Sequence, residues 1–148
     1  MTESRPSQTT AQSTVDPLAT TNVGTSASTD DDTLALAQAI AAAADERKGS
    51  EITILKVGDV SYLADYFVIV TGFSMVQVRA IARSIQDTLK VDWQREPLRT
   101  AGQRAGGWVL QDYGDVIVHV FLPQEREFYN LEAFWGHAER VPLDVDSQ

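Results

Sequence analysis

The chain of 148 residues has no cysteine and only two histidines. The absence of cysteine excludes a disulfide framework, a thiol nucleophile and a zinc–thiolate site, and it agrees with a reducing compartment. His119 and His137 have no second His or Cys at metal-ligand spacing, so we predict that the protein binds no metal ion and no other cofactor. Alternation along a strand puts His119 on the face of Ile117 and Phe121, which favours a buried or half-buried histidine with a hydrogen-bond partner.

Long hydrophobic runs are also missing, because no apolar stretch approaches the roughly 20 residues that a membrane-spanning helix needs. Basic residues are scarce: 12 Lys and Arg stand against 21 Asp and Glu, which gives a net charge of −9. A protein that bound nucleic acid mainly by neutralising phosphates would be basic. We therefore expect little direct nucleic-acid binding and a basic protein as the partner.

The common catalytic motifs, namely the G-x-S-x-G elbow, the Walker loop, H-E-x-x-H and G-x-G-x-x-G, are absent. One enzyme class needs a direct test, because residues 71–74 could mimic the glycine-serine loop of nucleotidyltransferases. Those enzymes also need two carboxylates, one residue apart on a later strand, to hold Mg²⁺. The Asp-x-Asp pairs, Asp30/Asp32 and Asp144/Asp146, lie in or beside the chain ends. We interpret Gly72 as a turn residue and Ser74 as a helix cap, and predict that the protein is not an enzyme.

The two ends of the chain differ in composition from its centre. Thirteen of the first thirty residues are Ser or Thr and none is aromatic. Such a segment buries too little apolar surface to order itself, so we predict a disordered tail over residues 1–30. A targeting peptide is the weaker alternative, because Glu3 and Asp16 are acidic and Arg5 is the one basic residue. We predict a cytoplasmic protein with a second loose tail at residues 141–148.

The periodicity of residues 31–140 predicts a single α/β domain with a mixed β-sheet flanked by helices. A helix over residues 33–48 is preceded by three aspartates that suit its N-terminus, and a second helix follows a capping box of Ser74 and Gln77. The stripe of the second helix comprises Met75, Val78, Ile81, Ala82, Ile85 and Leu89. We predict strands over residues 52–57, 66–70, 108–111 and 116–122, a short strand near residue 97, and a last helix over residues 125–135.

Aromatic residues and carboxylates gather in the stretch from Trp108 to Trp135. Aromatic anchors with charged neighbours have the composition of a protein-binding patch. Trp108 and Tyr113 fit an exposed contact surface and a core position equally well. Helical spacing favours a core position for the stripe of Phe128, Leu131 and Trp135.

Three blocks of this sequence together resemble the Iojap-related ribosomal silencing factors over about residues 33–140. The first block is Asp65-Tyr66-Phe67-Val68-Ile69-Val70-Thr71-Gly72, followed by Ser74, Gln77, Val78, Ala80, Ile81 and Ala82. The second is Trp108-Val109-Leu110 with Asp112-Tyr113-Gly114-Asp115-Val116-Ile117-Val118-His119-Val120-Phe121. The third is Arg126, Phe128-Tyr129, Leu131-Glu132 and Trp135. The joint spacing of the blocks is more specific than any block alone.

The resemblance implies a nucleotidyltransferase-like fold without the catalytic carboxylates. It implies that the protein binds the large ribosomal subunit through ribosomal protein L-fourteen, sterically blocks association of the two subunits and represses translation. A role in large-subunit assembly through the same surface is the alternative, and the resemblance also implies a tendency to form homodimers.

The contact surface implied by the resemblance comprises Trp108, Asp112, Tyr113 and Asp115, with Arg126, Tyr129 and Glu132 as second-rank candidates. The sequence departs from the family pattern before the second block, where Ala101-Gly102 stands in place of a usual Glu-Gly pair. This replacement removes either a charged contact with the partner or a structural feature of the loop.

Overall fold

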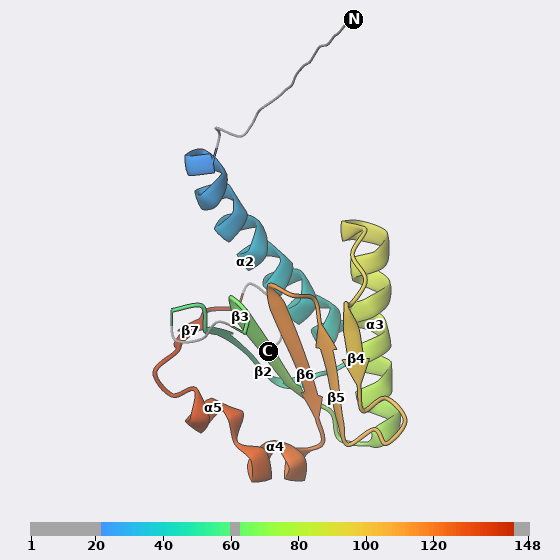
Figure 1. The fold of residues 1–148 in the computed structure, drawn as a ribbon. Coiled ribbons are helices and arrows are strands. Elements are labelled where there is room, and N and C mark those ends of the chain that lie inside the picture. Colours follow the sequence, from blue (N-terminus) through green and yellow to red (C-terminus); the bar gives the residue numbers. More distant parts are fainter. Residues whose placement is uncertain (1–21, 60–62, 144–148) are drawn as a thin grey trace, which may run out of the picture. The chain divides into compact units, whose positions relative to one another are not determined.

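The structure of the chain is a computed structural model, which describes residues 22–59 and 63–143 (Figure 1). Its contacts divide into two units, Met1–Asp32 and Thr33–Gln148, and the second unit holds the whole sheet. The elements in chain order are α2 (Asn22–Glu46), β2 (Ser50–Lys56), β3 (Tyr66–Thr71), α3 (Met75–Trp93), β4 (Arg99–Ala101), β5 (Trp108–Asp112), β6 (Val116–Phe121), α4 (Pro123–Tyr129), α5 (Leu131–Phe134) and β7 (Glu139–Val141).

The sheet has six strands in the order β4-β5-β6-β3-β2-β7. β3 and β6 pair in parallel at its centre, and the other neighbouring pairs are antiparallel. Every residue of β3 and of β6 is buried, as the continuous apolar runs of these two segments predict. The predicted α/β class with a mixed sheet is therefore confirmed.

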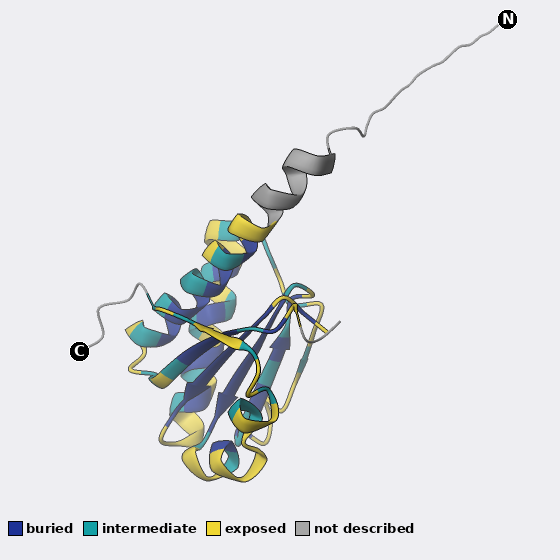
Figure 2. Cartoon of the chain, turned by 90° about the vertical axis from the view of Figure 1, so that its left-hand side faces the viewer, coloured by how far each residue is buried: buried dark blue, intermediate teal, exposed yellow. Residues whose placement is uncertain are grey.

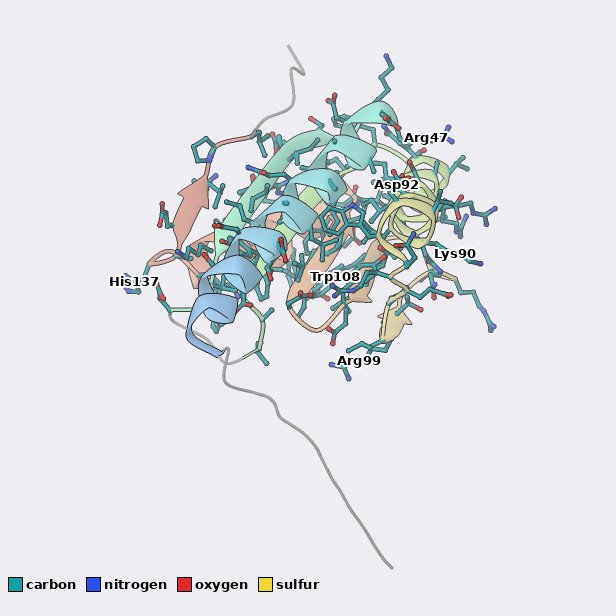
Figure 3. All side chains as sticks on the ribbon, turned by 90° about the horizontal axis from the view of Figure 1, so that it is seen from above. Arg47, Lys90, Asp92, Arg99, Trp108 and His137 are labelled. Atoms are coloured by element: carbon teal, nitrogen blue, oxygen red, sulfur yellow. The ribbon has the colours of Figure 1, made fainter. Side chains whose placement is uncertain are left out.

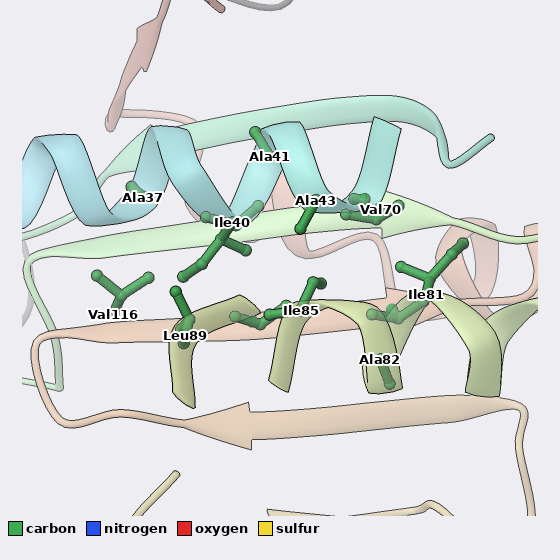
Figure 4. Packing of buried hydrophobic residues seen from close by; sticks show 14 of the residues in the cluster. Ala37, Ile40, Ala41, Ala43, Val70, Ile81, Ala82, Ile85, Leu89 and Val116 are labelled. Atoms are coloured by element: carbon green, nitrogen blue, oxygen red, sulfur yellow. The ribbon is translucent and has the colours of Figure 1, made fainter. Parts of the chain in front are cut away.

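Alternation along the strands divides their side chains between two cores. Val68, Val70, Val118 and Val120 belong to a core that helices α2 and α3 cover (Figure 4). Phe67, Ile69, Ile117 and Phe121 belong to a second core on the other face, against which Leu131, Trp135 and Ala138 pack. Figure 2 shows the difference in cover: the central strands are buried, whereas α4 is mostly exposed. The second face is therefore the one on which side chains remain accessible.

Helix α3 begins as the sequence predicts. The backbone N–H of Gln77 donates to Ser74 Oγ at 3.0 Å, and the Gln77 side chain accepts from the N–H of Phe73 at 2.7 Å. Five of the six stripe residues are buried, namely Val78, Ile81, Ala82, Ile85 and Leu89. The prediction for Met75 is wrong: its side chain is 46% exposed, because the first turn of the helix extends beyond the core.

The N-terminal helix differs from the prediction at its start. Helix α2 begins at Asn22, so Asp30, Asp31 and Asp32 lie within it and do not cap it. Residues 22–30 are helical where the composition predicts disorder, and the remaining tail residues, 1–21, lie outside the described residues. From Thr33 to Glu46 the predicted helix is confirmed, and Ala37, Ile40, Ala41 and Ala44 are buried on its predicted face, whereas Leu34 is partly buried. No helix in the described ranges is both long and apolar enough to cross a membrane.

The C-terminal segment also differs. The predicted last helix is divided into α4 and α5 at Asn130, whose φ of 48° is left-handed and ends α4. Because of this break Phe128 does not share a stripe with Leu131 and Trp135. It is 80% exposed, so its assignment to the core is wrong. Val141, expected in a loose tail, pairs with Ile54 as the end of strand β7, and residues 144–148 lie outside the described part.

The loop between β4 and β5 requires glycine at position 102. Gly102 has a φ of +82°, and a Cβ atom there would lie 1.9 Å from the carbonyl oxygen of Trp108. The glycine of the Ala101-Gly102 pair is thus fixed by sterics, while Ala101 is exposed.

We predict that Gly102→Ala lowers the free energy of unfolding by on the order of 3 kcal/mol, because it adds a steric clash to a left-handed backbone. Gly107→Ala is the matched control, since its Cβ would meet Glu125 at an ordinary contact distance of 3.5 Å. Urea denaturation of both variants measures the difference. Equal stability of the two variants would contradict this account of the loop.

Candidate partner-binding surface

Trp108 lies at the start of β5, on the sheet face that α4 and α5 partly cover. Its indole is half-buried, and its ring centroid is 4.5 Å from that of Tyr129 and 4.8 Å from that of Phe121. The indole N–H donates to His119 Nδ1 at 3.2 Å. The ring is thus held by His119 and Phe121 of β6 and by Tyr129 of α4.

His119 is the acceptor that orients this indole. It is 5% exposed, and burial lowers its pKa from 6.5 to about 4, so the imidazole is neutral at physiological pH. Because Nδ1 accepts from Trp108, the ring proton is on Nε2, which has no partner among the described residues. The expectation of a buried histidine with a hydrogen-bond partner is confirmed.

Three further aromatic side chains of α4 and α5 are exposed, and Tyr129 contacts Trp108. Tyr129 is 47% exposed, Phe128 is 80% exposed and Phe134 is 75% exposed. Phe128 contacts Tyr129 edge to face at 5.0 Å. Phe128 and Phe134 were absent from the predicted contact set, although the adjacent pair Phe128-Tyr129 could not place both rings in the core of one short helix.

Asp112 shares the face of Trp108 but lies at the other end of β5. Because side chains alternate along a strand, Trp108, Leu110 and Asp112 point to the same face of β5. The four steps from Trp108 to Asp112 separate these two residues by about 13 Å. Asp112 pairs with Arg99 at 3.2 Å, and Asp115 pairs with Arg95 at 2.7 Å. Of the predicted residues, the structure therefore brings Trp108 and Tyr129 together and leaves the two aspartates at the far end of the hairpin.

Tyr113 faces the opposite core. It is 3% exposed, and its hydroxyl donates to Gln111 Oε1 at 3.0 Å while Gln111 Nε2 donates to the Ala82 carbonyl at 2.8 Å. Burial raises the pKa of Tyr113, and the nearby Arg95 opposes this shift. A partner cannot reach the ring in this conformation, so Tyr113 serves to hold the hairpin on helix α3.

Arg126 is buried as well, at 7% exposure. Its guanidinium donates to both carboxylate oxygens of Glu132 and to the hydroxyl oxygens of Thr71 and Thr53, at distances from 2.8 to 3.1 Å. The hydrogen bonds from Arg126 lower the pKa of Glu132, and burial opposes them. Arg126 and Glu132 fasten α4 and α5 to β2 and β3, and so they position Tyr129 beside Trp108.

A hollow of about 330 Å³ lies beside this ion pair, near the carboxyl ends of β3 and β6. Glu51, Glu127 and Glu132 line it, but within the described ranges no three His, Cys, Asp or Glu side chains are grouped to hold a metal ion. Glu125 and Glu127, one residue apart after β6, are on helix α4, where positions i and i+2 do not face each other. Ser74 is used as a helix cap. The arrangement does not provide the paired carboxylates of a nucleotidyltransferase.

Residues 30–148 match the family model described as "Ribosomal silencing factor during starvation". The ribosomal silencing factor RsfS of Bacillus subtilis is 43% identical over 104 residues, which cover 70% of this chain and 87% of that protein. The chain belongs to the ribosomal silencing factor family. The family name links the chain to regulation of translation at the ribosome.

Other proteins that are similar to this chain are longer. Protein Iojap of Zea mays, described as chloroplastic, is 39% identical over 121 residues, or 80% of this chain and 52% of the maize protein. The chain thus spans about half the length of this curated relative. A mouse protein named "Mitochondrial assembly of ribosomal large subunit protein 1" is 28% identical over 92 residues, covering 61% of this chain and 40% of that protein.

The fold is that of the family's solved members. A crystal structure of a protein from Chromobacterium violaceum superposes with a TM-score of 0.68 at 33% identity. The superposition covers 77% of this chain and 93% of that one.

We predict that Arg126→Met lowers the free energy of unfolding by about 3 kcal/mol, because it leaves the Glu132 carboxylate half-buried without its main partner. Arg140→Met is the matched control. Arg140 is 64% exposed at its side chain and lies 3.7 Å from the same carboxylate, so its loss costs less than about 1 kcal/mol. Thermal denaturation of both variants compares them, and an equal loss would contradict the structural role of Arg126.

We predict that acid weakens the fold through His119. The folded-state pKa, about 4, lies below the unfolded value of 6.5, so the contribution of neutral His119 is complete above pH 6.5 and is lost as the pH falls toward 4. His119→Gln keeps an acceptor for Trp108 and removes the titration. Between pH 7 and pH 4 the wild type should lose on the order of 3 kcal/mol more unfolding free energy than this variant. Parallel losses in urea titrations would contradict the assignment.

Proposed function

We propose that this chain binds the large ribosomal subunit through ribosomal protein L-fourteen, and that the surface around Trp108 makes the contact. The observation that carries the proposal is a half-buried tryptophan, fixed by His119, Phe121 and Tyr129, with the exposed ring of Phe128 against Tyr129. Exposed aromatic clusters of this kind mark protein-binding sites on soluble domains.

The rigidity of Trp108 supports an anchoring role. Binding orders mobile side chains at a free-energy cost, and an anchor that is already ordered avoids that cost. The hydrogen bond to His119 and the two ring contacts supply that order before any partner arrives. The proposed surface is centred on Trp108, Leu110 and Tyr129, is extended by Phe128, and has Asp112 and Asp115 at its outer end.

Charge supports a basic protein as the partner. The chain carries −9, and Glu125 and Glu127 flank the aromatic surface on α4. A basic ribosomal protein would be steered toward this surface by long-range attraction, which accelerates association. Once bound, the domain would occupy the intersubunit side of the large subunit and prevent the small subunit from joining, so translation falls.

An assembly role through the same surface is the second candidate. The name of the mouse relative, which concerns assembly of the large ribosomal subunit, favours it. Subunit-joining assays separate the two functions: a blocker reduces joining of mature purified subunits, whereas an assembly factor favours immature particles and leaves joining unchanged. A catalytic function stays outside the proposal unless calorimetry detects tight nucleotide–Mg²⁺ binding.

A protein that binds ribosomes must lie in the same compartment as those ribosomes. We infer a cytoplasmic location, as for a bacterial silencing factor, while the chloroplastic description of the maize relative makes an organelle the alternative. Self-association of the free protein is a further part of the proposal, and the exposed rings of Phe128 and Phe134 are the surface available for it.

We predict that Trp108→Ala weakens binding to purified L-fourteen by at least about 2 kcal/mol, or roughly 30-fold, because it removes a buried interface anchor. Phe128→Ala should weaken binding by a smaller factor. Titration calorimetry measures both, and addition of each variant to mixed purified subunits shows whether joining recovers in parallel.

Trp93→Ala is the matched control for the loss of a tryptophan. Trp93 is also half-buried, but it ends α3 and packs against the helix-covered core. The Trp93→Ala variant should bind L-fourteen with the same affinity as the wild type. Unchanged affinity of a folded Trp108→Ala protein, or equal loss in both variants, would remove Trp108 from the interface.

A further inference from the structure

The acidic charge of the chain is unevenly distributed. Between Met75 and Gly107 lie six of its 12 basic residues and only three of its 21 acidic residues. This segment, from the start of α3 to the loop before β5, therefore carries +3 while the rest of the chain carries −12. The bulk value of −9 conceals a locally basic region.

Three of the six basic residues of this segment line a groove of about 740 Å³ between α3 and the loop that follows β4. Its lining residues are Arg79, Arg83, Arg104, Gln86, Gln103 and Asp87, with Ala82, Val109 and Gln111 at its floor. Three arginines and two glutamines thus line one hollow at its surface, together with the single acidic residue Asp87.

Arg79 builds the wall of the groove. Its Nε donates to the carbonyl of Gln103 at 3.0 Å and an Nη donates to the carbonyl of Arg104 at 2.8 Å. Gly106 makes this approach close, since a Cβ there would lie 3.3 Å from the Arg79 guanidinium. These partners are neutral, so they fix the guanidinium in place without cancelling its charge.

Arg95 and Arg99 of this segment form ion pairs with Asp115 and Asp112, but its remaining cations are available. Arg83, Lys90 and Arg104 are exposed, and none of them forms an ion pair within the part of the chain that the structure describes. Arg79 and Arg83 stand one helical turn apart, about 6 Å, and Lys90 continues their line to about 16 Å from Arg79. Figure 3 shows Lys90 projecting from α3 on the side of the domain away from His137.

We propose that this groove binds the phosphodiester backbone of an RNA strand. Guanidinium groups pair with phosphate oxygens in a bidentate manner, and amides add neutral donors. A line of cations that continues past the groove to Lys90 fits a repeating polyanion better than a single small phosphate. The expectation of little nucleic-acid binding, which rests on the total charge, is revised for this one face.

The groove and the Trp108 surface lie on different sides of the sheet. Val109 and Gln111 line the groove, and they alternate along β5 with Trp108 and Leu110 on the aromatic face. In the large-subunit setting, which rests on the proposed function, a protein contact through one face and a ribosomal RNA contact through the other hold the domain at two points. Two attachments on one rigid domain raise the overall affinity above that of either alone.

The test compares the full chain with the double variant Arg83→Glu/Arg104→Glu. Fluorescence anisotropy with a labelled oligouridylate at low salt should show binding by the wild type and a loss of at least about tenfold in the variant. The slope of log affinity against log salt should fall in magnitude by roughly 1 to 2. The control is Arg47→Glu/Arg140→Glu, which makes the same change of charge at exposed sites outside the groove and should bind within about twofold of the wild type.

Competition distinguishes the sources of phosphate. Displacement of the oligouridylate by inorganic pyrophosphate at equal phosphate concentration would overturn the RNA assignment in favour of a small anion. Absence of binding at low salt, or equal loss in both double variants, would also overturn it. Trp108→Ala should leave oligouridylate binding unchanged, so failure of the L-fourteen contact and failure of the RNA groove are observed separately.

Discussion

Strands β3 (Tyr66–Thr71) and β6 (Val116–Phe121) pair in parallel and are buried on both faces. The register of this pair determines which of their side chains face each of the two cores. A shift of one residue would exchange the two faces, and it would carry His119 and Phe121 from beneath Trp108 into the core under α2 and α3. The antiparallel pairing of β5 with β6 is a second register, and it sets Trp108 opposite Phe121. The strand pairing thus places the Trp108 side of the aromatic surface, and α4 adds Tyr129 and Phe128 to it.

Burial of His119 has two effects that serve the same end. It keeps the imidazole neutral, since the charged form would be desolvated, and the neutral ring offers Nδ1 as an acceptor to the indole of Trp108. The Arg126–Glu132 pair acts at a greater distance, by holding the two short helices against β2 and β3 so that Tyr129 stays beside Trp108. In the proposed interface both groups orient the contact residues and do not form the contact themselves.

Sequence periodicity predicted the central strands, the capped helix α3 and the hairpin, because each depends on local patterns of one element. Periodicity did not predict the features that depend on a single backbone angle, such as the end of α4, or on pairing with a distant strand, such as β7. The left-handed Asn130 broke the expected helix and exposed Phe128, and β7 has three residues whose only apolar member, Val141, finds its place by pairing with Ile54. The site was predicted in part: alternation along β5 already separates Tyr113 from Trp108, but the basic groove joins residues from α3 and a loop, and no local pattern shows that they meet.

The central claim is that the face bearing Trp108 contacts the large subunit, and site-specific photocrosslinking tests it most directly. A benzophenone amino acid at Phe128, which is 80% exposed beside Tyr129, is compared with the same group at Val91, which is 71% exposed on α3. With purified large subunits, the account predicts a dominant crosslink from position 128 to ribosomal protein L-fourteen and none to that protein from position 91. A crosslink to L-fourteen from position 91 but not from 128 would contradict it.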